Sequence, residues 1–417
     1  MIIEPTENDI EIFTTIKKLF PLVLKSSLSI TVCAIFVIWL YLSSLGRLDI
    51  FTEAIGFNSL LGIVFGFTLI TFIIICILIF IPSLILSLII YDQEKKFFKN
   101  HAIKNSFISI NIFNGWLFGI ISIIFFFLFY KFKEYEKGLI IAWLMLLAMT
   151  SLTLTNLELR RNKKTTKNGI ITIKRKTFVK LSLIFMIPSI IQIIPFSLFL
   201  SQVTFQKQTS EFLQLLFILI LFIAFSTISF LPGIQFISNI KSNIVRRIIL
   251  TLTLLIISLI TLSSLIPTIP IMLTNATMHL AGIADWREHQ FSIKENTYPH
   301  SMFSGKQWNT RYYEDIPDRF FITGVAVFYF GNIKLICPTS INESRIENMK
   351  FSPNNPEENQ KKSEAFKHAA TPCFPIDKKD IVQWDSPLSD PIYYEKIRLT
   401  TPRFPLDIFN YLNKSRN

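Results

Sequence analysis

Charged side chains are missing from long stretches of the first two thirds of this sequence. Seven apolar runs have no aspartate, glutamate, lysine or arginine in their interiors. They lie near residues 27–45, 58–84, 112–130, 138–156, 179–201, 212–239 and 248–274. A helix of about 20 apolar residues crosses a bilayer with its backbone hydrogen bonds satisfied internally. We therefore expect an α-helical polytopic bundle of about seven transmembrane helices, spanning residues 27–275.

The same absence disfavours two classes of membrane protein. Pumps and ion-coupled transporters need ionisable groups or broken helices to move charge through hydrocarbon, and the runs contain no ionisable group in their interiors. The fifth run does contain Pro188, Gln192 and Pro195 near one helix face. We interpret them as a kink whose glutamine bonds to a neighbouring helix, with a polar pathway as the alternative.

Glycine is scarce, at 13 of 417 residues. Two pairs nevertheless have the small-xxx-small spacing that lets helices approach closely, Gly62 with Gly66 and Gly115 with Gly119. Packing within the bundle or against a second copy of the chain satisfies this pattern equally. The second apolar run continues to Tyr91, too long for one upright span and too short for two, so we expect tilt or a helix that extends past Pro82.

Sequence motifs for catalysis are also missing. There is no Gly-x-Ser-x-Gly elbow and no HExxH pattern. We therefore expect no metal and no cofactor, and the sequence favours a non-catalytic protein.

The net charge of +13 belongs to the membrane half. Residues 1–275 contain 24 Lys+Arg against 12 Asp+Glu, whereas residues 276–417 contain 18 against 17. The basic residues lie in short loops between apolar runs, as membrane topology alone produces, so we expect the lipid bilayer and not nucleic acid as a partner.

Loop charges also predict the orientation. With the N-terminus in the cytoplasm, nineteen Lys and Arg lie in cytoplasmic segments, nine of them between Arg160 and Lys180, against five in the opposite loops. Basic loops stay in the cytoplasm, so this predicts an N-in, C-out protein of a bacterial inner membrane with residues 276–417 periplasmic or extracellular. The first run is an uncleaved anchor, and residues 1–26 form either an interfacial helix or a frayed cytoplasmic tail.

Residues 276–417 have the composition and hydrophobic pattern of a soluble α+β domain. The segments Phe320–Tyr329 and Ile333–Ile336 read as strands. The polar stretch 351–369 reads as an exposed loop or mobile insertion.

Cysteine is rare, with four residues in the chain. Cys33 and Cys76 lie in apolar runs, where a thiol behaves as a small hydrophobe. Cys337 and Cys373 lie in the domain expected outside, where a disulfide is stable. We predict that they pair, with two buried free thiols as the alternative.

A polar cluster follows the last apolar run directly and contains His279, Asp285, Trp286, Arg287 and His289. We expect it at the membrane surface, where Trp286 could anchor in the interface and Arg287 could meet lipid phosphates. Its histidine spacing matches no compact zinc motif.

These features lead to three functional hypotheses. The first is a non-catalytic inner-membrane protein whose exported domain binds a protein partner, as an immunity protein that neutralises a toxin acting in or across that membrane. The second is an enzyme that modifies lipid or cell-wall glycan with the polar cluster. The third is a transporter or channel component lined by the kinked fifth helix.

Overall fold

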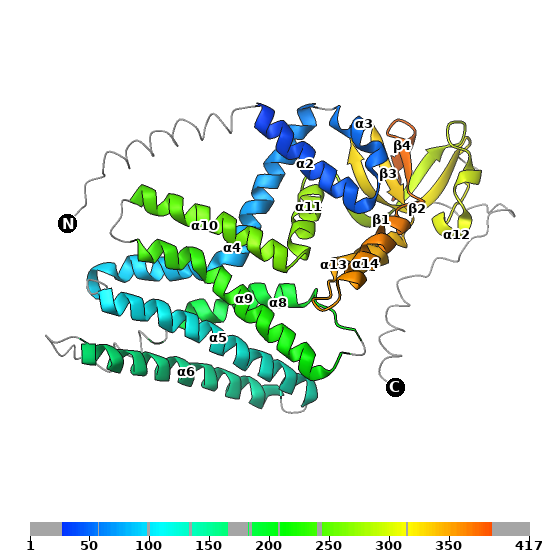
Figure 1. Ribbon diagram of the computed structural model, residues 1–417. Coiled ribbons are helices and arrows are strands. Elements are labelled where there is room, and N and C mark those ends of the chain that lie inside the picture. The colour runs from blue at the N-terminus through cyan, green and yellow to red at the C-terminus, as the bar shows by residue number, and fades with distance from the viewer. Residues whose placement is uncertain are drawn as a thin grey trace. The chain divides into compact units, whose positions relative to one another are not determined.

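The computed structural model describes residues 27–385 apart from gaps at 57, 98–100, 133–135, 166–181, 183–185, 207–208, 240–243 and 314–315. The fold is mostly helical, with one sheet region near its C-terminus (Figure 1). The prediction for residues 1–26 lies outside the described residues.

Five of the described helices are long and apolar enough to cross a membrane. They are Leu60–Ile89, Ile108–Phe125, Lys137–Leu157, Glu211–Ser238 and Val245–Leu265. Two shorter apolar helices, Ile30–Leu45 and Met186–Leu200, account for the other runs. By length and composition the chain is a membrane protein.

Two of the apolar runs differ in how they end. The second run forms a single helix, α4 (Asn58–Phe97), with Pro82 inside it, so the expected extension past Pro82 is confirmed. The last run does not continue to residue 274, because α10 (Ile244–Leu265) ends before Pro267 and α11 (Thr268–Leu280) begins after it. Proline lacks the N–H that would continue the helix and disfavours helical backbone at the residue before it.

The chain divides into two compact units. One contains α4 from Phe72 onward, α5 (His101–Lys131), α6 (Glu136–Thr165), α8 (Ile193–Leu200), α9 (Glu211–Ser238), α10 and residues 351–354. The other contains α2 (Ser27–Leu45), η1 (Leu48–Ile50), α3 (Phe51–Ile55), α4 up to Thr71, and α11 from Ile271 onward. It also contains the sheet domain, which is the described part of the chain after α11 apart from residues 351–354. The sheet domain thus shares its unit with the first apolar helix.

In the first unit, α5 packs against α6 and α9, and α9 packs against α10 (Figure 1). A serine clamp joins α4 to α9. Ser83 Oγ donates to the Ser229 carbonyl at 2.6 Å and accepts from Gly233 N–H at 2.9 Å. A Cβ at Gly233 would lie 2.8 Å from the Ser83 carbonyl oxygen, so only glycine allows this approach.

The two glycine pairs lie in different surroundings. Gly115 and Gly119 of α5 face α9, and a Cβ on Gly119 would overlap the ring of Phe222. A Cβ on Gly62 or Gly66 of α4 would meet no described residue within 4 Å outside its own stretch of helix. Gly115 and Gly119 therefore serve packing within the bundle.

In the second unit, five antiparallel strands form a sheet in the order β4-β3-β2-β1-β5. They are β1 (Asp285–Lys294), β2 (Arg319–Phe330), β3 (Ile333–Cys337), β4 (Phe374–Asp377) and β5 (Ile381–Gln383). The two strands expected from the sequence are confirmed as β2 and β3. β2 has the β-branched and aromatic composition that suits a buried sheet, and β3 has two isoleucines.

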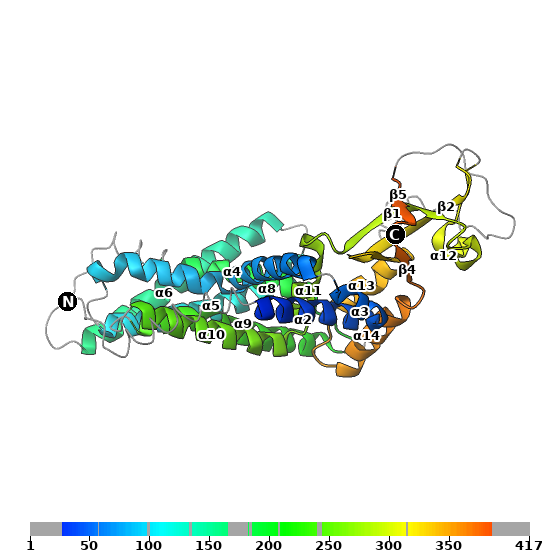
Figure 2. The same ribbon diagram turned by 90° about the horizontal axis from the view of Figure 1, so that it is seen from above.

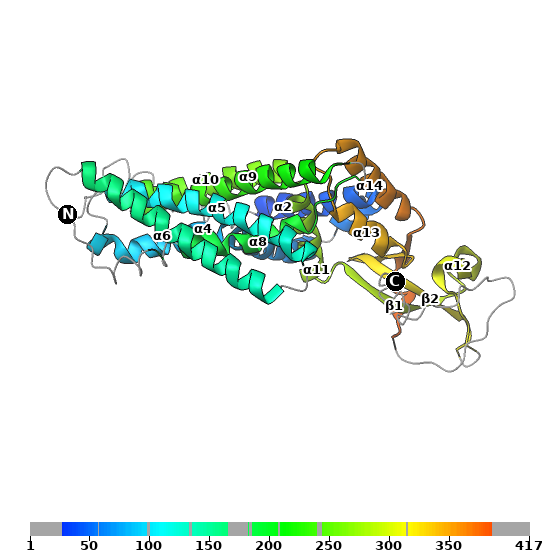
Figure 3. The same cartoon turned by 90° about the horizontal axis from the view of Figure 1, so that it is seen from below.

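Different elements cover the two faces of this sheet (Figures 2 and 3). On one face, Val325, Phe328 and Leu335 pack against α2, α13 (Ile341–Met349) and α14 (Pro356–Ala369). On the other, Phe291 and Ile322 pack against Phe303 of the loop after η3 (His300–Met302) and Trp308 of α12 (Gly305–Trp308). Burying each large apolar side chain stabilises the fold by roughly 1.5–3 kcal/mol.

A β-bulge fixes α2 to the sheet. Between Ala326 and Phe328 the register against β3 shifts by one extra residue, Val327. The Val327 carbonyl accepts a hydrogen bond from the Tyr41 hydroxyl of α2 at 2.6 Å, and both residues are buried. Because a buried carbonyl needs a partner, the tyrosine satisfies a group that the bulge presents.

The disulfide between Cys337 and Cys373 is present, as the sequence predicted, and joins the end of β3 to the residue before β4. The guanidinium of Arg47, just after α2, donates to the Cys373 carbonyl. The disulfide indicates folding in an oxidising compartment.

The prediction of a loop at 351–369 is wrong, because most of this stretch is α14. Asn355 caps the helix by accepting from Glu358 N–H at 3.2 Å, and Pro356 occupies its first turn. Glu357 and Glu358 lie at the positive end of the helix dipole and Lys367 and His368 at the negative end. These are the ordinary start and stop signals of a helix, and the polar composition obscured them.

Candidate functional site

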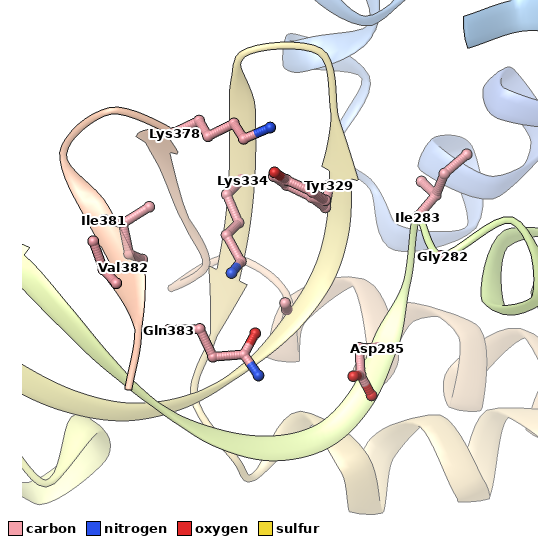
Figure 4. Close-up of a pocket in the computed structure, with 10 residues that line it drawn as sticks. Gly282, Ile283, Asp285, Tyr329, Lys334, Lys378, Ile381, Val382 and Gln383 are labelled. Carbon is pink, nitrogen blue, oxygen red and sulfur yellow. The ribbon is translucent and has the colours of Figure 1, made fainter. Parts of the chain in front are cut away.

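A concave site of about 480 Å³ opens on the sheet domain. Its walls come from β1, β2, β3, β5 and the turn between β4 and β5 (Figure 4). The apolar part is formed by Ile283, Ala326, Ile381 and Val382. The polar groups come from Asp285, Tyr329, Lys334, Lys378 and Gln383.

Two lysines share one aromatic ring in this pocket. The Nζ of Lys334 lies 5.4 Å from the centre of the Tyr329 ring, and the Nζ of Lys378 lies 5.0 Å from the same ring. Lys334 is also 4.6 Å from the Phe291 ring. In Figure 4 the side chain of Lys334 points toward Gln383, while Lys378 reaches toward Tyr329.

Neither lysine has a carboxylate within ion-pair distance among the residues that the structure describes. Burial lowers the pKa of the Lys334 ammonium, and the nearby charge of Lys378 acts in the same direction. Asp385 and Asp285 oppose that shift from a distance. Aromatic rings and the more distant charges of Asp385 and Asp285 stabilise the Lys334 cation, so the pocket presents two ammonium groups without a direct ion pair among the described residues.

A histidine held between two carboxylates borders the pocket. The ring of His289 lies 2.8 Å from Asp385 Oδ2 through Nδ1 and 3.0 Å from Asp285 Oδ2 through Nε2. The His289 side chain is 8% exposed. A bulge of two extra residues in β1, between Asp285 and Glu288, lets these two β1 side chains meet.

Both carboxylates carry several hydrogen bonds. Arg287 donates to Asp285 from Nε, Nη2 and its backbone N–H, which together with His289 holds the pKa of Asp285 well below its usual range. Burial raises the pKa of Asp385, but donation from Gln383, the Gln290 N–H and His289 outweighs burial and leaves the pKa lowered. Both groups are therefore carboxylates at neutral pH.

The polar cluster expected from the sequence is only partly brought together. His279, Asp285, Trp286 and Arg287 line a second cavity of about 380 Å³ with Arg345, whereas His289 contacts Asp285 on the side of the larger pocket. Trp286 is 9% exposed and lies under the guanidinium of Arg345 at 4.3 Å. Arg287 is the member that faces outward, with a side chain 77% exposed.

No group of three His, Cys, Asp or Glu residues within the described part of the chain has the geometry to hold a metal ion. His279 Nδ1 instead contacts the carbonyl of Ala284 at 3.2 Å. His289 is occupied by its two carboxylates.

The kinked segment of the first unit also differs from its expected role. Gln192 forms a turn between residues 186–191 and α8, so Pro188 and Pro195 do flank a break. The Gln192 side chain is fully buried, and neither of its amide atoms has a hydrogen-bond partner within the described part of the chain. The expected bond to a neighbouring helix is not made among these residues.

Sequence reasoning missed Lys334, Lys378 and Asp385. Lys334 had a local signal, since it is the single charged residue in the apolar strand Ile333–Cys337. Asp385 had none, because it meets a histidine 96 residues earlier in the chain.

Comparison with protein-family models, with curated proteins and with solved structures yields no match for this chain. The site is therefore interpreted from its own geometry.

Proposed function

We propose that this chain is a non-catalytic membrane protein that crosses the bacterial inner membrane seven times and binds a partner through its sheet domain outside the cytoplasm. The observation that carries the proposal is the pair of lysines, Lys334 and Lys378, around the Tyr329 ring, neither of which has a direct ion pair among the described residues. Such a pocket favours an anionic group, and its apolar wall favours a carboxylate attached to a larger molecule.

Loop charges support seven crossings over five. If the five long helices alone crossed, the basic segments near Lys95 and between Arg160 and Lys180 would share a side with the sheet domain. Basic loops stay in the cytoplasm, and the Cys337–Cys373 disulfide would then lie in a reducing compartment. Counting the two shorter helices as crossings removes this conflict.

Two contacts agree with that topology. Arg47, which follows α2, bonds to the carbonyl of Cys373 in the sheet domain. Val203, which follows α8, forms a parallel bridge with Phe351, between α13 and α14. Both loops belong to the extracytoplasmic side in the seven-crossing topology.

The geometry around His289 favours binding over catalysis. A general base needs a ring nitrogen within reach of the substrate proton, and both ring nitrogens of His289 already face carboxylates. Asp285 is likewise engaged by Arg287. The lysines are the pocket groups left to meet a ligand.

The partner we propose is a protein toxin that acts in or across the membrane and presents a carboxylate to the lysine pocket. Cells expressing the product of the adjacent gene would be tested with and without this protein. Wild-type chain should protect, and the Lys334→Gln, Lys378→Gln double variant should lose at least tenfold of that protection. Lys379→Gln is the matched control, because its side chain is 76% exposed and lies 3.6 Å from Asp377.

Absence of protection by the wild-type chain would remove the immunity role. The pocket itself is tested separately with acetate and phosphate, which should raise the melting temperature of the purified full-length protein in a saturable way. Affinity should fall as pH rises through the lowered pKa of Lys334, because the ammonium is then lost. Equal responses in wild type and the double variant would contradict anion binding in the pocket.

A further inference from the structure

A helix break inside the bundle carries polar groups that nothing in the proposed function uses. Pro195 has no N–H, so it cannot make the usual helical bond to the carbonyl of Ile191. The break falls at Gln192, immediately before α8. Broken helices within a bundle expose backbone and side-chain oxygens to the interior.

Three buried side chains of the bundle have polar atoms without a hydrogen-bond partner among the described residues. Gln192 at the break lacks partners for both amide atoms, Ser226 of α9 lacks one for Oγ, and Asn114 of α5 lacks one for Oδ1. All three side chains are fully buried. The amide nitrogen of Asn114 already donates to Ser151 at 3.5 Å, so its oxygen is the group left over.

Two of these side chains meet at one point of α5. A Cβ placed on Gly115 would lie 3.0 Å from Gln192 Oε1 and 3.3 Å from Ser226 Oγ. The Asn114 side chain instead faces Ser151 of α6. The oxygens of Gln192 and Ser226 therefore meet at the bare backbone position that glycine leaves.

Unpaired polar groups in the low-dielectric interior of a bundle are costly unless something bonds to them. The side-chain oxygens of Gln192 and Ser226 meet here, and Pro195 leaves the Ile191 carbonyl without its helical donor. Carbonyl and hydroxyl oxygens of this kind coordinate a positively charged ligand. Neither side chain is a carboxylate, and divalent cations in proteins usually require one.

We propose that Gln192 and Ser226 form a binding site for a small monovalent cation, coordinated by neutral oxygens at the helix break. The site lies within the bundle and is independent of the lysine pocket.

Sodium is the probe for this site. Full-length protein in nanodiscs would be transferred to N-methyl-D-glucamine chloride and titrated with sodium or potassium chloride at constant ionic strength, with the melting temperature as readout. Either alkali cation should raise the melting temperature in a saturable way. Ser226→Ala should weaken the apparent affinity at least tenfold.

Gln192→Met separates cation binding from misfolding. It should abolish the cation response, while the melting temperature without alkali cation should stay equal or rise, because the variant removes an unpaired buried amide. Gln214→Met is the control and should keep the full response, since the Gln214 amide already donates to the Thr209 carbonyl at 2.9 Å. Equal melting temperatures in all three salts, or an unchanged response in Gln192→Met, would mean that the site holds only water and would overturn the proposal.

Discussion

Tyr41 offers the sharpest test of how α2 and the sheet hold together. Its hydroxyl donates to the Val327 carbonyl at 2.6 Å, and neither residue is exposed beyond 1%. Replacing Tyr41 by phenylalanine keeps the ring and removes the hydroxyl donor from that buried carbonyl. The expected cost is about 1–3 kcal/mol, the penalty for an unsatisfied buried acceptor.

Native-state hydrogen exchange measures this cost where it arises. The amides of β2 around the bulge, Val325 to Phe330, should lose protection by about 5–150-fold in full-length protein, which corresponds to that free energy. The matched control is Tyr329→Phe in the same strand, whose hydroxyl makes no hydrogen bond among the described residues. If the two variants lose equal protection, or neither loses any, the tyrosine does not hold the bulge carbonyl.

Two other predictions concern the glycine packing and the carboxylate of Asp285. Gly119→Ala should destabilise the bundle by about 1–3 kcal/mol in thermal unfolding, because its methyl group overlaps Phe222. Gly62→Ala, whose methyl group meets open space, should be neutral or stabilise by about 0.5–1 kcal/mol. Equal stabilities of the two variants would refute the close contact of α5 with α9. Asp285 has a folded-state pKa below its unfolded value, so its stabilising effect is present at neutral pH and disappears as pH falls through the folded pKa. The melting temperature of wild type should therefore converge with that of Asp285→Asn in acid and exceed it at pH 7, while Glu288→Gln, an exposed carboxylate of β1, should follow wild type throughout.

Features with a local physical signature were predictable from the sequence. Charge-free runs of helix length indicated the five helices that are long and apolar enough to cross a membrane, and the extension of α4 past Pro82 followed from its unbroken apolar pattern. The strands β2 and β3 followed from their apolar composition. The Cys337–Cys373 pair followed from where the two residues lie relative to the apolar runs.

Features that depend on distant partners were not predictable in this way. Asp385 completes the contacts of His289 only because β5 pairs with β1. The lysine pocket forms only where several strands and a turn converge, and no residue spacing in the sequence predicts that convergence. By contrast, α14 has local helix-start signals in its capping residue Asn355 and in Pro356. It was still predicted as a loop, because its polar composition is also typical of loops.

The distance in sequence between Tyr41 and Val327 also sets a delay during synthesis of the chain. The two partners are 286 residues apart, so at about 5–20 residues per second the ribosome takes roughly 15–60 seconds to supply the second after the first. During that time the Tyr41 hydroxyl lacks this acceptor and the sheet-binding side of α2 is uncovered. A later segment of the chain thus completes an earlier helix, and a fragment beginning at residue 276 would lack the helix that covers one face of its sheet.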